Sequence, residues 1–184
     1  MDLLQEKKII EEAKKNPEAF GLLYDEYYKA IFGYALKRTA DVEGAQDITS
    51  QVFFKALRGL KKFKWQNISF SAWLYRITIN EINDFYRSRK KNTNLSLEEI
   101  SEIASYDTPQ KEMELAEEKI KKNQEFIKIQ KSILKLNPIY QAVITLRFFD
   151  KKKISEISQI LGKPEGTVKS QINRGLEELR KLID

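Results

Sequence analysis

Apolar side chains recur every three or four residues along most of the chain, which is the spacing of one face of an α-helix. In the first half, this pattern covers residues 20–35 and 45–57. Asn16, which precedes a proline, and Asp41 are the predicted N-caps of these helices. A third amphipathic segment begins near Ser71. The pattern therefore predicts a bundle of helices.

The last third of the chain carries a second helical pattern. Asn137, again followed by a proline, marks a helix start, and residues 154–161 form a short amphipathic helix that Gly162 is expected to end. After the connector at 163–166 comes a final helix whose apolar stripe is Val168, Ile172, Leu176, Leu179 and Ile183. Two helices around a tight turn, the second polar and basic on its outer face, are typical of a helix-turn-helix. A plain helical hairpin with a solvated face is the alternative.

Charge divides the chain into three parts. Residues 1–91 hold 17 Lys and Arg against 12 Asp and Glu, residues 92–127 hold 4 against 9, and residues 128–184 hold 12 against 6. The middle part is rich in Ser, Thr, Asn and Glu, and it includes the start of a long helix expected from about residue 111 to 136. We therefore expect an all-α fold: two small helical domains, 1–91 and 128–184, joined by an acidic linker at 92–127.

Composition excludes several kinds of site. The chain contains no cysteine and no histidine, so disulfides, thiol nucleophiles, histidine bases and Cys/His zinc sites are impossible. We expect no enzyme activity, no cofactor and no metal. No apolar run approaches the roughly twenty residues that span a bilayer, and we expect a soluble, cytoplasmic protein without membrane insertion. Two basic modules suit a polyanion, although mild basicity alone is common.

The segment from residue 63 to 71 has a different sequence pattern. Aromatic residues alternate with small polar ones, and apolar residues no longer recur at helical spacing. Aromatic side chains can stack on unpaired bases, and amide and hydroxyl groups can hydrogen-bond to them. This segment is therefore a candidate contact for single-stranded nucleic acid. Trp73, which is in phase with Ile77, is assigned to the core.

Three strings in this order resemble the extracytoplasmic-function sigma factors of the sigma-70 family. They are AQDITSQVF at residues 45–53, SAWLYRI at 71–77 and LGKPEGTVKS at 161–170. The resemblance implies a region 2 bundle and a region 4 helix-turn-helix. It also implies a protein that binds core RNA polymerase and directs promoter recognition, −10 melting and transcription initiation. The expected partners are bacterial core polymerase, promoter DNA and, in addition, an anti-sigma factor or another recruiting protein.

The resemblance assigns roles residue by residue. The residues expected to bind a coiled coil of the largest polymerase subunit are Asp47, Gln51, Val52 and Lys55. Those expected to bind the −10 element are Phe63, Trp65, Asn67, Ser69, Arg76, Asn80, Arg87, Arg89, Lys90 and Lys91. Those expected to read the −35 element are Lys163, Thr167, Lys169, Ser170, Gln171 and Arg174. For the basic residues, a solvated helix end is the alternative.

This chain departs from the family pattern at positions that face partners. Gly44 and Gln46 stand where the family usually has acidic residues, and Gln171 stands where arginine is frequent. Glutamine can bond adenine through two hydrogen bonds whereas arginine favours guanine, so we expect a shifted −35 preference. A stand-alone helix-turn-helix regulator is the main alternative function, and it would bind promoter DNA tightly without polymerase. A helical adaptor or enzyme with accidental motifs is the second alternative.

Overall fold

The computed structural model describes residues 3–64, 68–92 and 127–183, and every regular element among them is a helix. The all-α fold class predicted from the sequence is therefore confirmed. The first part of the chain forms helices α1 (Leu3–Ala13), α2 (Phe20–Thr39), α3 (Val42–Gly59) and α4 (Phe70–Asn92), with short 3-10 turns at Pro17–Ala19 and Leu60–Lys62. We call this part the N-terminal unit.

The ends of these helices follow local signals in the sequence. The Asn16 side chain accepts a hydrogen bond from the Glu18 amide at 3.0 Å, and Asp41 accepts one from the Gly44 amide at 2.9 Å. The predicted N-cap Asp41 of α3 is therefore confirmed, while Asn16 caps the 3-10 turn Pro17–Ala19 that leads into α2. Helix α2 ends at Ala40, which has a left-handed backbone with φ of 52°. The sharp reversal at Ala40 and Asp41 lets α3 run back along α2.

The C-terminal unit comprises a helical stretch at residues 127–135, helix α6 (Pro138–Ile144), a π-helical turn η3 (Thr145–Phe149), α7 (Ile154–Leu161) and α8 (Glu165–Ile183). Asn137 caps α6 by accepting the Ile139 amide at 3.1 Å. Gly162 ends α7 with φ of 63°, a conformation that suits glycine because it has no Cβ. The helix-turn-helix predicted from the sequence is thus present.

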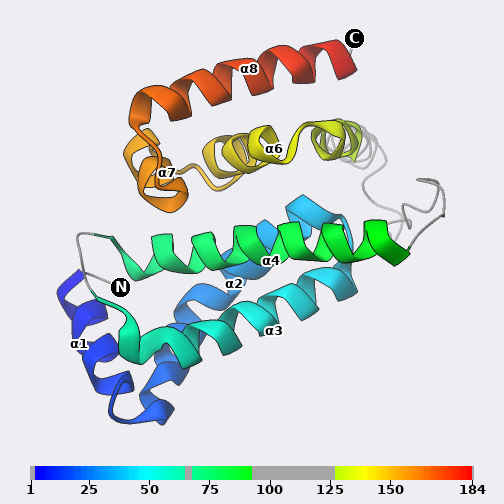
Figure 1. Cartoon of the computed structure of the whole chain (residues 1–184). Coiled ribbons are helices and arrows are strands. Elements are labelled where there is room, and N and C mark those ends of the chain that lie inside the picture. The colour runs from blue at the N-terminus through cyan, green and yellow to red at the C-terminus, as the bar shows by residue number, and fades with distance from the viewer. Residues whose placement is uncertain (1–2, 65–67, 93–126, 184) are drawn as a thin grey trace, which may run out of the picture.

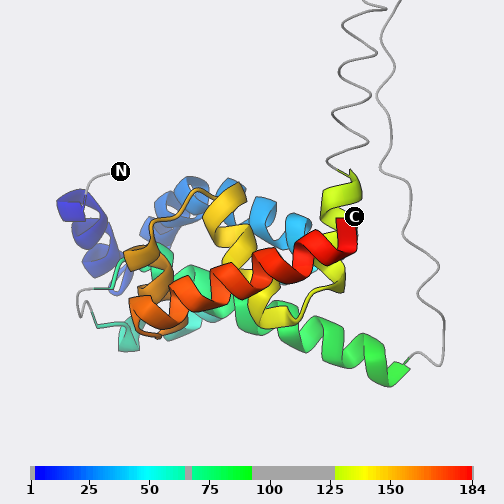
Figure 2. The same cartoon turned by 90° about the horizontal axis from the view of Figure 1, so that it is seen from above.

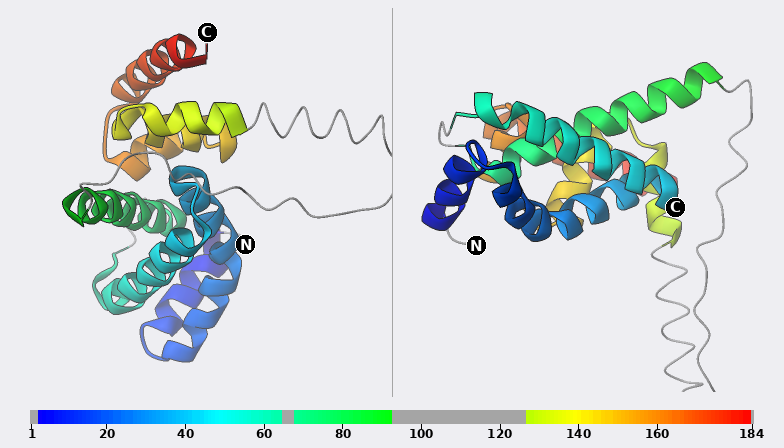
Figure 3. Two further views of the ribbon diagram at one scale, coloured as in Figure 1. Left: turned by 90° about the vertical axis from the view of Figure 1, so that its right-hand side faces the viewer. Right: turned by 90° about the horizontal axis from the view of Figure 1, so that it is seen from below.

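The two units pack against each other (Figure 1). Helices α2, α3 and α4 lie side by side, α6 and α7 lie over α4, and α8 forms the outermost layer (Figures 1 and 3). Seen from above, α8 crosses over the N-terminal unit (Figure 2). Buried residues of both units, among them Leu23, Tyr75 and Ile157, belong to one continuous apolar cluster. The two helical parts expected from the sequence are therefore in direct contact with each other.

We call the polar part of this contact surface the seam, and Asp150 is at its centre. Its carboxylate pairs with the Lys37 ammonium of α2 at 2.7 Å and accepts a hydrogen bond from the Tyr75 hydroxyl of α4 at 2.8 Å. Burial and the Asp150 charge raise the pKa of Tyr75 well above its ordinary value. Tyr75 therefore keeps its proton and remains a donor to Asp150.

Two arginines complete the seam. Arg38 of α2 is fully buried and donates to the Gln141 side chain of α6 at 3.3 Å and to the Tyr34 hydroxyl at 3.0 Å. Arg76 of α4 donates to two carbonyls at the end of α7, those of Gln159 at 2.7 Å and Ile160 at 3.1 Å. These carbonyls are at the negative end of the helix dipole, which favours a cation there.

Candidate nucleic-acid and polymerase interfaces

Helix α8 presents a polar face to solvent. Val168 and Ile172 are buried against the rest of the C-terminal unit, whereas Lys169 and Ser170 between them are exposed. The exposed side chains of its first turns are Glu165, Thr167, Lys169, Ser170, Asn173 and Arg174. The structure shows no hydrogen bond or ion pair from the Lys169 or Arg174 side chain to any residue that it describes. These cations are therefore available to a ligand.

Two of the predicted −35 residues are less accessible. Lys163 and Gln171 are half-buried, and the Gln171 Oε1 atom is enclosed without a hydrogen-bond partner among the described residues. An amide oxygen in such a position lacks the hydrogen bonds that water or a base would supply. Reading a base through both amide atoms, as the sequence suggested, requires this side chain to turn outward.

A hollow of about 260 Å³ lies where the segment after α3 leads into α4. It is lined by Lys62, Phe63, Lys64, Ile68, Trp73 and Arg76. Apolar and aromatic side chains thus lie beside three cations. An unpaired base can stack on an aromatic face while its phosphate lies near a cation, so this combination suits single-stranded DNA.

The structure changes the roles of two predicted −10 residues beside this hollow. Phe63 is only 8% exposed, and its ring contacts Trp73 at 4.7 Å and Phe70 at 5.8 Å between centroids. It therefore supports the hollow and is largely unavailable for stacking on a base. Ser69 caps α4, because its hydroxyl accepts a hydrogen bond from the Ala72 amide at 3.1 Å. Trp65 and Asn67 lie outside the described residues.

The three arginines of α4 already have partners within the protein. Arg76 bonds to the end of α7, Arg87 pairs with Asp84, and Arg89 pairs with Asp41 at 2.7 Å. The prediction that these arginines hold phosphates therefore needs each of them to exchange a protein partner for DNA. Lys90 and Lys91 lie in the last turn of α4, and their side chains are outside the description.

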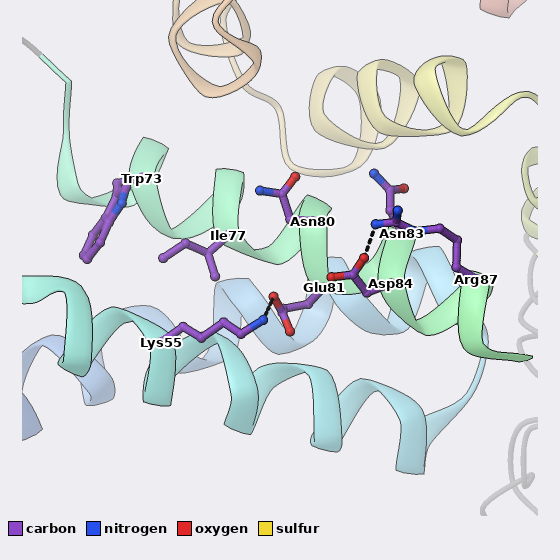
Figure 4. Close-up of a pocket in the computed structure, with 8 residues that line it drawn as sticks. All are labelled: Lys55, Trp73, Ile77, Asn80, Glu81, Asn83, Asp84 and Arg87. Atoms are coloured by element: carbon purple, nitrogen blue, oxygen red, sulfur yellow. Dashed lines mark hydrogen bonds and ion pairs between the residues drawn. The ribbon is translucent and has the colours of Figure 1, made fainter.

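A second, open hollow of about 500 Å³ lies along α4 and faces α3 at one edge (Figure 4). Lys55 of α3 reaches Glu81 of α4 at 2.5 Å, while the exposed Asn80 points away from this pair (Figure 4). Asn80, a predicted −10 residue, is thus free to donate and accept hydrogen bonds at this surface. Trp73 lines both hollows and is half-buried, so its assignment to the core is only partly correct.

The outer face of α3 carries three of the four residues predicted to bind polymerase. Asp47, Gln51 and Lys55 are exposed, whereas Val52 is fully buried. The assignment of Val52 to this interface is therefore wrong, because Val52 follows the inward stripe of the helix. α3 lies on the far side of α4 from α8 (Figures 1 and 3).

Two apolar residues on the same face were not recognised from the sequence. Phe54 is 54% exposed and Leu57 is 38% exposed, and the Arg58 guanidinium lies over the Phe54 ring at 5.5 Å. The spacing of Asp47, Gln51, Phe54 and Arg58 by four, three and four residues marks one helix face and could have revealed them. Large exposed apolar side chains are typical of protein contacts.

The presence of glycine at position 44, where the family usually has an acidic residue, has a steric explanation. A Cβ atom added at Gly44 would lie 2.7 Å from the tip of the Phe85 ring of α4. The Arg89 guanidinium covers the Phe85 ring at 4.5 Å and pairs with Asp41, which itself caps α3. Gly44 therefore lets α4 approach the first turn of α3. Gln46 is exposed, and nothing in the structure explains its replacement of an acid.

Over the ranges that the structure describes, no group of three carboxylate, histidine or cysteine side chains is arranged to hold a metal ion. Within the same ranges, no helix combines the length and the apolar character needed to cross a membrane.

The fold and these faces define a class: a helical protein with a bundle that offers protein and single-strand contacts and a helix-turn-helix that suits duplex DNA. The model of sigma-70 region 2 matches residues 23–92, and that of sigma-70 region 4 matches residues 126–179. The ECF RNA polymerase sigma factor SigW of Bacillus subtilis is 33% identical over the whole chain and 98% of its own length. The chain belongs to the extracytoplasmic-function (ECF) sigma factors of the sigma-70 family.

Other comparisons agree with this assignment. The RNA polymerase sigma factor YlaC of Bacillus subtilis is 31% identical over 91% of this chain and 93% of its own length. Among solved structures, CnrH in complex with the cytosolic domain of CnrY matches with a TM-score of 0.70 and 22% identity over 97% of both chains. At that identity the likeness concerns the fold, and it covers both units.

Proposed function

We propose that this sigma factor binds core RNA polymerase through the outer face of α3 and directs it to promoters with two separated elements. The hollow at the start of α4 captures unpaired bases of the −10 element, and the outer face of α8 reads the −35 element as duplex. Recruitment, rather than a covalent reaction, is then its role in initiation. Its place of action is the cytoplasm, where core polymerase works.

The observation that carries this proposal is the free polar face of α8. Its helix-turn-helix leaves Thr167, Lys169, Ser170 and Arg174 exposed, and α8 itself forms the layer farthest from the N-terminal unit (Figure 1). A recognition helix contacts base edges through side chains in its N-terminal half and phosphates through cations, and both kinds of group are present here. Binding in a major groove therefore needs no rearrangement within the C-terminal unit.

The hollow at the start of α4 supports a role with unpaired DNA. Trp73 and Ile68 supply apolar surface, and Lys62 and Lys64 supply charge at its edge. Stacking contributes on the order of 1–3 kcal/mol per base. That amount does not offset the cost of opening several base pairs, so melting depends on the further DNA contacts that polymerase supplies. We therefore expect weak binding of the free chain to duplex DNA.

An experiment with three arms tests the proposal. Core polymerase transcribes a promoter library with and without this chain, and a gel-shift assay measures binding of the chain alone to the selected promoters. New start sites that depend on the chain, together with weak binding in the absence of core, support a sigma factor. Tight binding without core and no new start sites would instead indicate a stand-alone regulator. No new start sites and no binding in either assay would reject both.

An anti-sigma protein is the expected negative partner. Besides CnrH with CnrY, the sigma factor RpoE of Bartonella quintana has been solved with the anti-sigma factor NepR, and it matches this chain with a TM-score of 0.64 and 18% identity over 89% of this chain and 96% of its own. RpoE is bound there to an anti-sigma factor, and CnrH was likewise solved in complex with a second protein. We propose that this chain is controlled in the same way, and co-purification of a partner that inhibits the transcription assay would test it.

A further inference from the structure

Helix α1 buries a carboxylate in a position where an apolar residue would be expected. Glu6, Ile10 and Ala13 form its inward stripe, and they are 3%, 1% and 4% exposed. Isoleucine and alanine are ordinary core residues, but a glutamate is rarely so buried unless it has partners. The match to sigma-70 region 2 starts at Leu23, so α1 lies outside it.

Glu6 joins three helices. One carboxylate oxygen accepts a hydrogen bond from the Tyr27 hydroxyl of α2, and the carboxylate also accepts one from the backbone amide of Phe70. Phe70 is the first residue of α4, and its ring contacts that of Tyr27 at 5.7 Å. A negative charge is favourable at this end of a helix, where unpaired amides point outward. A side chain 64 positions earlier in the chain therefore fixes the first turn of α4.

The burial of Glu6 is not free of cost. Desolvation raises the pKa of Glu6 above its ordinary value, although the bonds from Tyr27 and Phe70 favour the charged form. A raised pKa in the folded state means that ionised Glu6 lowers stability at neutral pH relative to acid conditions. A residue that contributed only to stability would be better replaced by a neutral one of the same shape. The carboxylate therefore requires another explanation.

The position of Phe70 supplies that explanation. Its ring contacts those of Phe63 and Trp73, which line the hollow at the start of α4. We propose that Glu6 is a positioning residue: it fixes the first turn of α4, and with it the Phe63 and Trp73 walls of the hollow, in the arrangement that captures an unpaired −10 base. This inference rests on the proposed function of that hollow.

The test compares Glu6→Gln with Glu11→Gln in the full-length chain bound to core polymerase. Glutamine keeps the shape of Glu6 and one accepting oxygen, but it replaces the second oxygen by an NH2 donor and removes the charge. Glu11 is on the exposed face of the same helix, where it pairs with Lys14 at 2.7 Å, so its replacement is a matched control. Three quantities are measured: affinity for a fluorescent single-stranded −10 oligonucleotide, affinity for core, and the Tm of the free chain.

We expect Glu6→Gln to weaken binding of the oligonucleotide about fivefold, the size of a charge effect at a helix end. Core affinity should be unchanged and the Tm should be equal or higher, whereas Glu11→Gln should leave binding unaltered. Tyr27→Phe, which removes one bond but keeps the charge, should give a smaller loss. A merely structural role would instead lower the Tm and both affinities together.

The outcomes separate this inference from the proposed function. If the wild-type complex binds a −10 oligonucleotide no better than a scrambled one, the proposed role of the hollow is wrong and the positioning role falls with it. If the wild-type complex is selective and Glu6→Gln equals it, only the positioning role is overturned. A parallel loss of Tm, core affinity and oligonucleotide affinity in Glu6→Gln also overturns it, because Glu6 would then be structural.

Discussion

Helices α4 and α8 both carry side chains predicted to contact DNA, but their surroundings differ. On α8, Lys169 and Arg174 are exposed, and neither side chain bonds to a residue that the structure describes. On α4, Arg76 is bonded to the end of α7 and Arg89 to Asp41. The start of α4 is fixed by Glu6 from another helix, whereas α8 begins directly after its own short connector.

This difference concerns the free energy that each cation can contribute to DNA binding. A free surface cation gains the whole benefit when it displaces counterions from DNA. A cation on α4 must first lose its protein partner, which offsets part of that benefit. We infer that α8 contributes to duplex binding from the outset. On α4, Arg76 contributes only when the two units have separated, and Arg89 only when it exchanges Asp41 for DNA.

The largest effect is expected on α8. Replacing Lys169 and Arg174 together by alanine removes one or two base or phosphate contacts each worth about 1–3 kcal/mol, so −35 duplex affinity of the core-bound factor should fall roughly 100-fold. Competition binding with a duplex −35 fragment measures it. Arg180→Ala with Lys181→Ala, at the far end of the same helix, is the charge-matched control and should have little effect. A loss equal to that from Arg87→Ala with Arg89→Ala would contradict the comparison.

The next effect concerns the seam. Asp150→Asn removes the charge that pairs with Lys37, and we expect the contact between the two units to weaken by about 1–2 kcal/mol. The chain contains no cysteine, so Lys61→Cys and Lys181→Cys provide unique sites for fluorescent labels on the two units. Energy transfer between the labels should fall in the Asp150→Asn chain. Unchanged transfer, with an unchanged Tm, would show that the Asp150 contacts do not hold the units together.

A smaller effect is expected on stability when alanine replaces a glycine packed against α4 or a glycine on α8. Gly44→Ala places a methyl group against Phe85, and we expect a loss of about 1 kcal/mol in the free energy of unfolding. Gly166→Ala on α8 has nothing within 4 Å of the added atom, so helix propensity should raise stability by about 0.5–1 kcal/mol. Urea unfolding of both variants measures the difference. Equal shifts would mean that the Phe85 ring moves aside at little cost.

The smallest effect concerns Gln171. Gln171→Arg restores the residue frequent in the family and should move the preferred −35 base from adenine toward guanine. If the new arginine contacts the backbone instead, the slope of log affinity against log salt should steepen by about one. Selection from a randomised −35 library gives the preference, and a salt titration gives the slope. Neither change would appear if the enclosed Gln171 side chain stays turned inward.

The sequence predicted the elements well where the signal is local. Asn16, Asp41 and Asn137 cap helices through atoms two or three residues away, and Gly162 ends α7 through its own backbone conformation. The apolar stripe of α8 likewise follows from spacing alone. Such features depend on neighbours in the chain, so one sequence suffices to predict them.

The candidate sites were predicted less completely, because they depend on contacts between distant residues. The partners of Arg76 lie more than eighty positions away in α7, and the partners of Glu6 lie in α2 and α4. A glutamate near a helix start has the ordinary role of favouring the helix dipole, so the pattern gave no sign that Glu6 is buried. The burial of Val52 and most of the burial of Phe63 were not predicted, because a helix valine or an aromatic loop residue can face either way.

The seam has a geometric consequence for a promoter. The −10 and −35 elements are about 25 base pairs apart by their numbering, which is roughly 85 Å of B-form duplex at 3.4 Å per pair. Among the described residues, the layer of α6, η3 and α7 lies between α4 and α8, a gap of roughly 20 Å for layers spaced by helix packing (Figure 1). The packed chain therefore cannot span both elements. Residues 93–126 could reach about 110 Å at full extension. The chain is therefore long enough for the two units to separate, whereas the contacts of the seam hold them together.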